Sequence, residues 1–217
     1  DLMFPRESFL DPAFTVSVPV NYTAYGIVDL IAHCLENYFG AGEPDVIDHF
    51  TFDIIKDAMT WGPPLLKDPA NIDLRAKILL DSTLALNGTT RYGKANGDWG
   101  VHGIGHQLSM LYDMPHGATR SIAYIAWLKL HADRCPERIL KLGKNLFGAE
   151  TIEETINEFD AFFRSIGSPV NLLEADIEEA EKDAILKQLD DNAVSGVHHQ
   201  LNSADHQQIV ELMFASN

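Results

Sequence analysis

Residues 102–117 read HGIGHQLSMLYDMPHG and place three histidines in one short stretch of chain. His102 and His106 are one helical turn apart, so on a helix their side chains point the same way. Pro115 and a glycine flank His116, which predicts a turn or a helix start at that point rather than the interior of a helix. A helix followed by such a turn can bring His116 back toward the first two imidazoles.

A second pair with helical spacing, Asp29 and His33, lies far upstream. Two helices that face each other could therefore offer one carboxylate oxygen and three imidazole nitrogens to a divalent cation, with one imidazole left over. Taken alone, Asp29 and His33 are also typical of a buried hydrogen-bonded pair or of a solvated helix face. The three downstream histidines by themselves leave both a metal site and a coincidence open.

The composition indicates the class of protein. The chain has 217 residues, of which 46% are hydrophobic, and this is enough for the core of one large domain or two small ones. The 16 Lys and Arg residues against 32 Asp and Glu residues give a formal charge of −16, which repels phosphate backbones and anionic membrane surfaces. No apolar run is long enough to cross a bilayer, and no signal peptide is evident. We therefore expect a soluble, cytoplasmic protein that binds neither nucleic acid nor membranes.

Apolar residues recur at helical spacing along most of the chain, and no strand is indicated after the first 20 residues. We predict one all-α domain over residues 21–217, preceded by an extended segment over residues 1–20. The polar, glycine-bearing segment 88–98 is expected to be a loop of the kind that can act as a lid. Cys34 and Cys135 have no CxxC partner and are expected to be ordinary buried thiols. Besides the histidine segment, helices are expected at residues 21–39, 45–60, 73–87, 117–134, 137–147, 151–166 and 175–190, with a short one from Ser203.

Two groups of residues resemble the signatures of a known enzyme family. One group lies between residues 10 and 36 and the other between residues 102 and 117, in the order that the family has them. Both resemble the iron-containing alcohol dehydrogenase family, and particularly its butanol dehydrogenase and broad aldehyde reductase members. The residues that carry the resemblance are Leu10-Asp11-Pro12, Pro19, Gly26-Ile27-Val28-Asp29, His33, Glu36, His102, His106 and Pro115-His116-Gly117.

The resemblance implies a fold, a metal site and an assembly. In such enzymes a multi-helix C-terminal domain of the dehydroquinate synthase-like type holds the metal through the residues that match Asp29, His33, His102 and His116. The residue that matches His106 lies beside the nicotinamide and the substrate. Members of the family form homodimers or larger assemblies, so the resemblance implies a homodimer here.

The chain resembles only the second half of such an enzyme. The first half is a dinucleotide-binding α/β domain with a glycine-rich phosphate loop, and no GxGxxG element occurs in these 217 residues. We therefore expect NAD(P)H to bind mainly to that missing domain, with residues 1–20 leading from it into the helical domain.

The expected reaction is hydride transfer between NAD(P)(H) and a small primary alcohol or aldehyde, such as butanol or butanal. A divalent cation with an open coordination position stabilises the alkoxide that forms as hydride leaves. A histidine-rich site suits Fe²⁺ and Zn²⁺, held by Asp29, His33, His102 and His116. His106 is the candidate for proton transfer, because the ordinary pKa of an imidazole lies near neutrality.

Two other functions stay open on the sequence alone. A metal-dependent hydrolase would use the same side chains to activate water, and a non-catalytic helical binding or dimerisation module would use the histidines structurally. Trp99 and Tyr25 are either pocket walls or simple core residues. The remaining histidines have no partner at useful spacing and are expected to be structural or exposed: His49, His131, His198, His199 and His206.

Overall fold

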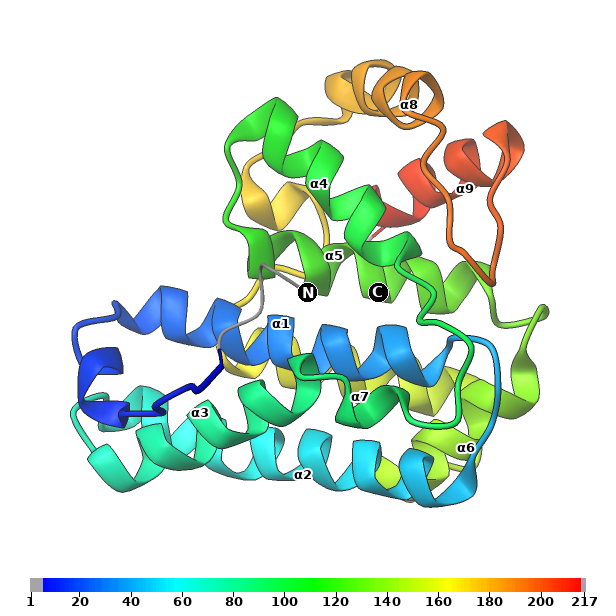
Figure 1. Ribbon diagram of the computed structural model, residues 1–217. Coiled ribbons are helices and arrows are strands. Elements are labelled where there is room, and N and C mark those ends of the chain that lie inside the picture. Colours follow the sequence, from blue (N-terminus) through cyan, green and yellow to red (C-terminus); the bar gives the residue numbers. More distant parts are fainter. Residues whose placement is uncertain (1–5, 216–217) are drawn as a thin grey trace.

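The computed structural model describes residues 6–215, which form nine α-helices, four short 3-10 helices and no strand (Figure 1). The predicted all-α fold is therefore confirmed. In this part of the chain no helix is long and apolar enough to span a membrane. Cys34 and Cys135 are both free; Cys34 is buried, as expected, whereas Cys135 is only partly buried. The helices are η1 (Pro12–Thr15), α1 (Val20–Tyr38), α2 (Asp45–Lys67), α3 (Ile72–Leu86), η2 (Thr89–Arg91), α4 (Gly100–Tyr112), α5 (His116–Leu130), α6 (Pro136–Phe147), α7 (Ile152–Ser165), η3 (Leu173–Ala175), η4 (Glu179–Glu181), α8 (Lys182–Asp191) and α9 (Ser203–Phe214).

The central element of the fold is α5. All of its residues are buried except His116 at its first position and Lys129 near its end. It packs against α1, α4, α7 and α9, and Figure 1 shows it between α1 and α4. A helix that is surrounded in this way is apolar on most of its sides, which is the pattern that the sequence has here. The histidine at its start therefore has a rigid support.

The upstream motif lies on α1, which runs along α5. The apolar side chains that share one face of α1 from Ile27 onward, among them Ile31 and Leu35, are buried, as their helical spacing predicts. The hydroxyl of Tyr124 donates a hydrogen bond of 3.2 Å to the carbonyl oxygen of Ala32 and ties α5 to α1. These contacts fix the position of α1 relative to α5.

The start of α5 approaches the backbone of α1 closely. A methyl group at Gly117 would overlap the carbonyl oxygen of Tyr25, so only glycine leaves room for this approach. The approach brings the first residue of α5, His116, beside α1. The glycine that follows the third histidine is therefore required by packing.

One helix is longer than expected. The sequence predicts that the second helix ends near residue 60, but α2 continues through Pro63 and Pro64 to Lys67. A proline removes a backbone donor and usually ends a helix. Here Leu65 is fully buried, and its burial in the core offsets the loss of backbone hydrogen bonding.

Another helix is shorter than expected. The sequence predicts a helix over residues 175–190, but α8 begins only at Lys182. Two 3-10 helices precede it, and Asp176 has a φ of 59°, in the left-handed region, which ends the first of them. A left-handed residue cannot continue a right-handed helix.

The expected extended segment over residues 1–20 falls partly outside the described residues. Within them, η1 interrupts the extended chain, and the carboxylate of Asp11 caps it by accepting a hydrogen bond of 2.9 Å from the N–H of Ala13. Aspartate is a preferred residue at such a cap. The described part of this segment, from residue 6, is therefore irregular chain with one short helical turn.

Candidate metal centre

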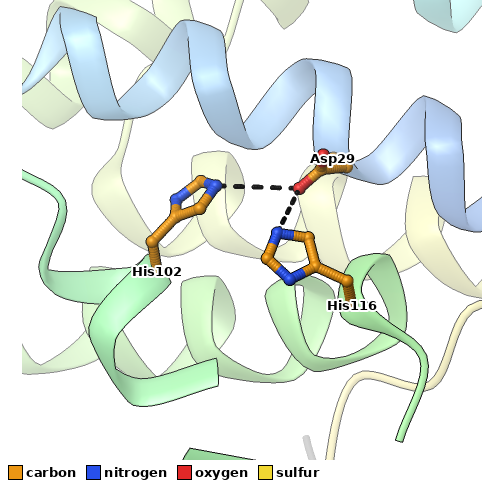
Figure 2. Close-up of side chains that lie close together, drawn as sticks. All are labelled: Asp29, His102 and His116. Carbon is orange, nitrogen blue, oxygen red and sulfur yellow. Dashed lines mark ion pairs between the residues drawn. The ribbon is translucent and has the colours of Figure 1, made fainter. Parts of the chain in front are cut away.

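Three side chains from three helices converge in one place: Asp29 on α1, His102 on α4 and His116 at the start of α5 (Figure 2). Asp29 Oδ1 lies 3.4 Å from His116 Nε2 and 3.7 Å from His102 Nε2. One ligand atom from each residue lies within 4.8 Å of the other two. The structure therefore brings together three of the four residues predicted to hold a metal.

The donor set at this place fits a divalent cation. Asp29 Oδ1 and His102 Nε2 are both buried without a hydrogen-bond partner. Leaving such an atom unpaired costs about 1–3 kcal/mol, and an ion between the two would satisfy both. Burial opposes the ionisation of Asp29, but the nearby imidazoles of His102 and His33 outweigh it and hold its pKa well below the ordinary value. The carboxylate is therefore ionised at neutral pH, as a metal ligand must be.

The position of His102 is set by Glu36, which lies on α1 and is almost completely buried. Glu36 Oε2 accepts a hydrogen bond of 2.6 Å from the N–H of Trp99, and Oε1 accepts one of 2.9 Å from the N–H of His102. These N–H groups belong to the start of α4, where a helix has donors without partners and favours a negative charge. Glu36 of α1, the helix that carries Asp29, thus caps α4, the helix that carries His102.

Glu36 also sets the orientation of the His102 ring. Its Oε1 atom lies 2.9 Å from His102 Nδ1, and an ionised carboxylate can only accept. The contact therefore favours a proton on Nδ1 and leaves the lone pair of Nε2 directed at Asp29. Burial opposes protonation of this ring, but the nearby carboxylates of Asp29 and Glu36 outweigh it and raise the pKa of His102. A metal at Nε2 would compete with a proton.

His33 lies at the edge of the cluster. Its Nε2 atom is 3.5 Å from Asp29 Oδ2, the carboxylate oxygen that does not face the other two histidines. The centre of its ring is 4.5 Å from the centre of the His102 ring. The group whose ligand atoms all lie within 4.8 Å of one another consists of Asp29, His102 and His116. His33 is therefore not a member of this group, and its ion pair with Asp29 connects it to the group.

His106 lies beside the cluster, at the surface of the protein. Its side chain is exposed, and its ring centre is 5.2 Å from that of His116 and 6.3 Å from that of His102. Partial burial and the charge of Arg120 lower its pKa. The same two causes lower the pKa of His116 to about 4, so that this ring is neutral at pH 7. A neutral imidazole can accept a proton or bind a metal.

A cavity of about 240 Å³ lies beside the cluster, with Trp99 as one of its walls. The Trp99 ring centre is 5.7 Å from that of His33 and 5.4 Å from that of His102. Tyr25 lines a different cavity, of about 550 Å³, which includes Pro115. The residues that line the smaller cavity are His33, Asn37, Ala85, Leu86, Asn87, Gly88, Arg91 and Trp99.

The segment 88–98 is anchored at its end. Asp98 is buried, and its Oδ1 atom accepts hydrogen bonds from the N–H groups of His198 and His199, at 3.0 and 2.6 Å. The N–H of Asp98 donates a bond of 2.9 Å to the carbonyl oxygen of Glu36. The segment is also held before this point, because the N–H of Ala95 donates a hydrogen bond of 2.9 Å to the carbonyl oxygen of Ala41 and Lys94 Nζ lies 3.0 Å from Asp48 Oδ1. These contacts do not favour the expected movement as a lid.

The spacing of the histidines does not reveal Arg120, which lies next to them. Its side chain is fully buried, Nη1 donates a hydrogen bond of 3.1 Å to the carbonyl oxygen of His102, and Nε lies 3.9 Å from Asp29 Oδ1. The available signal was a charged residue within an otherwise apolar helix, because a buried charge requires partners. Glu36 gave a similar signal, because it is a charged residue among the apolar residues of α1, one turn after His33.

Two of the remaining histidines have the structural roles that we expect. The His131 ring stacks on Trp127 with ring centres 3.8 Å apart, and its Nδ1 atom lies 2.9 Å from the carbonyl oxygen of that residue. His206 lies between the carboxylate of Asp190 and the carbonyl oxygen of Val194, each at 2.6 Å. Neither belongs to the converging group.

Known proteins match most of this chain. A family model described as the Fe-containing alcohol dehydrogenase family, C-terminal, matches residues 23–216. The probable NADH-dependent butanol dehydrogenase 1 of Bacillus subtilis (strain 168) is 33% identical over 94% of this chain and 55% of its own length. The NADPH-dependent aldehyde reductase YqhD of Escherichia coli (strain K12) is 28% identical over 91% of this chain and 53% of its own.

A solved structure agrees with these matches. The crystal structure of NADH-dependent butanol dehydrogenase A from Thermotoga maritima has a TM-score of 0.91 at 31% identity, over 98% of this chain and 57% of that chain. The present chain thus spans about half the length of the relatives that it matches. The chain belongs to the Fe-containing alcohol dehydrogenase family and corresponds to its C-terminal part.

Proposed function

We propose that this chain is the metal-binding part of an NAD(P)H-dependent alcohol dehydrogenase or aldehyde reductase that acts on small primary alcohols or aldehydes, such as butanol or butanal. The convergence of Asp29, His102 and His116 carries the proposal, because it leaves two buried ligand atoms without partners. The names of the relatives, butanol dehydrogenases and an aldehyde reductase, support the substrate class. They give no support to a hydrolase or to a non-catalytic binding module.

The metal in this proposal is Fe²⁺ or Zn²⁺. Asp29, His102 and His116 would hold it, with His33 beside Asp29 as the fourth ligand. Such an ion, when bound, polarises the oxygen of the alcohol or aldehyde and stabilises its negative charge. A single carboxylate among neutral imidazoles leaves the ion with net positive charge, which suits this chemistry.

His106 would pass a proton between the substrate oxygen and solvent. Its ring lies beside His116 and its side chain is exposed, so it is close to the cluster on the side that water reaches. Its lowered pKa keeps the ring neutral at pH 7 and able to accept the proton of an alcohol. We also propose that His106 contacts the nicotinamide.

The cofactor would be bound mainly by a part of the protein outside this sequence. The 217 residues contain no glycine-rich loop of the kind that receives a pyrophosphate. Residues 1–20 would lead from that part into the helical domain over residues 21–217. We further propose that the protein is a homodimer and acts in the cytoplasm.

Metal content tests the proposal directly. The chain would be loaded anaerobically with Fe²⁺ or Zn²⁺, desalted and analysed for metal. We expect about one equivalent in the wild type and little in His116→Ala or Asp29→Asn, because each variant removes one ligand. His49→Ala, which changes an exposed histidine on α2, should keep the metal. Equal metal in the wild type and His116→Ala would show that the ligand assignment is wrong.

A further inference from the structure

Arg120 lies one turn after His116 on α5, and none of its side chain is exposed. Nη1 donates to the carbonyl oxygens of His102 and Val101 in the first turn of α4, at 3.1 and 3.4 Å. Nη2 lies 2.9 Å from Nδ1 and 2.8 Å from Nε2 of His116. The two ring nitrogens point in diverging directions, so a group equally close to both lies against the ring instead of in line with either. The guanidinium therefore packs on the His116 ring.

The chain makes room for this guanidinium at Gly105, in the Gly-Ile-Gly sequence between the two histidines of α4. A methyl group at Gly105 would overlap Nη1 of Arg120 and would also come within 2.5 Å of Oγ1 of the preceding residue, Thr119. A methyl group at Gly103 would meet only a side-chain carbon of Val194, at 3.0 Å. Of these two glycines of α4, Gly105 is therefore the one that leaves room for Arg120.

The charge of Arg120 faces the carboxylate of the cluster. Arg120 Nε has no hydrogen-bond partner and lies 3.9 Å from Asp29 Oδ1. Among the described residues, the other groups within ion-pair distance of Asp29 are His33, His102 and His116. These histidines must be neutral to bind a metal, whereas a guanidinium is a permanent cation at neutral pH. Arg120 is therefore the fixed positive charge next to Asp29.

We propose that Arg120 is a positioning residue of the metal centre, a fixed cation that holds the ligand side chains of α1, α4 and α5 in place and weakens the binding of a divalent metal. The inference rests on the metal site proposed above. Both effects have one origin, because a charge that attracts Asp29 also repels a divalent cation bound to the same carboxylate. Removal of the charge should therefore destabilise the protein in chelator and tighten metal binding.

The test compares Arg120→Gln, which keeps a donor without the charge, with Arg120→Lys, which keeps the charge. The measurements are the Zn²⁺ dissociation constant by chelator competition and the melting temperature in chelator. We expect Arg120→Gln to bind Zn²⁺ at least about tenfold more tightly and to melt at a lower temperature. Arg120→Lys should keep the wild-type affinity. Arg75→Gln is the matched control, because Arg75 is a buried arginine on α3 whose bonds go to Thr23 and backbone carbonyls.

Gly105→Ala tests the positioning without a change at residue 120, and it serves even if Arg120→Gln is too unstable to purify. Alanine is favoured over glycine within a helix, so Gly103→Ala should melt at or above the wild-type temperature. Gly105→Ala should instead melt at a lower temperature and shift the visible absorption spectrum of bound Co²⁺, because it displaces the guanidinium from the His116 ring.

The results separate this inference from the metal site itself. Zn²⁺ affinity in Arg120→Gln equal to or weaker than in the wild type would overturn the role of the charge. A wild-type melting temperature and Co²⁺ spectrum in Gly105→Ala would overturn the positioning. If the wild type bound no metal, or His116→Ala bound it normally, the metal site would fail before Arg120 came into question.

Discussion

At the level of single residues, Glu36 connects the fold to the chemistry of the cluster. Its carboxylate caps α4 and faces Nδ1 of His102. Glu36→Gln keeps the shape but removes the charge that orients the imidazole. We expect metal affinity to fall about 10–100-fold, as for other carboxylates that orient a histidine ligand. Chelator competition with Zn²⁺ or Co²⁺ measures this change.

A second glutamate provides the control for this variant. Glu174 also accepts backbone and side-chain hydrogen bonds, from the N–H of Val170 at 3.1 Å and from Nδ2 of Asn171 at 2.9 Å. Glu174→Gln should lower the melting temperature without a change in metal affinity. Equal losses of affinity in both glutamine variants would contradict an orienting role for Glu36.

The candidate ligands could be named from the sequence, but their supports could not. Spacing alone places Asp29 with His33 and His102 with His106 on shared helix faces and marks a turn before His116. The choice of ligands among these residues came from the resemblance to the family. The position of Arg120 depends on how closely α4 packs on α5, which Gly105 permits. Such contacts between helices leave no periodic signal in the sequence.

At the level of elements, the approach of α5 to α1 decides whether the cluster forms. Gly117→Ala would place a methyl group onto the carbonyl oxygen of Tyr25. We expect it to lower the free energy of unfolding by about 1–3 kcal/mol, as other overpacking changes do, and to weaken metal binding because His116 moves. Urea unfolding and metal analysis measure the two effects.

The neighbouring glycine of α1 is the matched control for this substitution. A methyl group at Gly26 would meet nothing within 4 Å, so Gly26→Ala should raise the free energy of unfolding by about 0.5–1 kcal/mol through helix propensity. If both alanine variants behaved alike, the close approach of the two helices would not be what requires Gly117.

The existence of most helices could be predicted, but some of their ends could not. Repeated apolar spacing marks α1 and α5 well, because each buries a continuous face. The ends of α2 and α8 depend on burial of Leu65 and on the left-handed backbone of Asp176. Both are decided by packing and local conformation, which override the usual stop signals.

At the level of the whole molecule, stability should depend on pH through Asp81. This residue is buried, and burial together with the charge of Asp57 raises its pKa to about 7. The unfolded chain loses this proton near the ordinary value of 3.8, so the folded state binds more protons between the two and stability falls as pH rises through that window. Asp81→Asn should be more stable than the wild type at pH 8, by about 1–3 kcal/mol.

Urea unfolding at several pH values measures this effect. The difference between Asp81→Asn and the wild type should shrink toward pH 4, where the carboxyl is protonated in the folded protein. Asp57→Asn should keep most of the wild-type pH dependence, since burial is the larger cause of the shift. An unchanged pH dependence in Asp81→Asn would contradict this account.

The position of Trp99 also provides an optical probe. Glu36 holds its backbone, which has a left-handed φ of 66°, and its indole ring lies 5.4 Å from the His102 ring. A paramagnetic ion at the cluster would lie close enough to quench the fluorescence of this indole. Among the three tryptophans of the chain, Trp99 would thus make the light emitted by the unlabelled protein a direct signal of metal uptake.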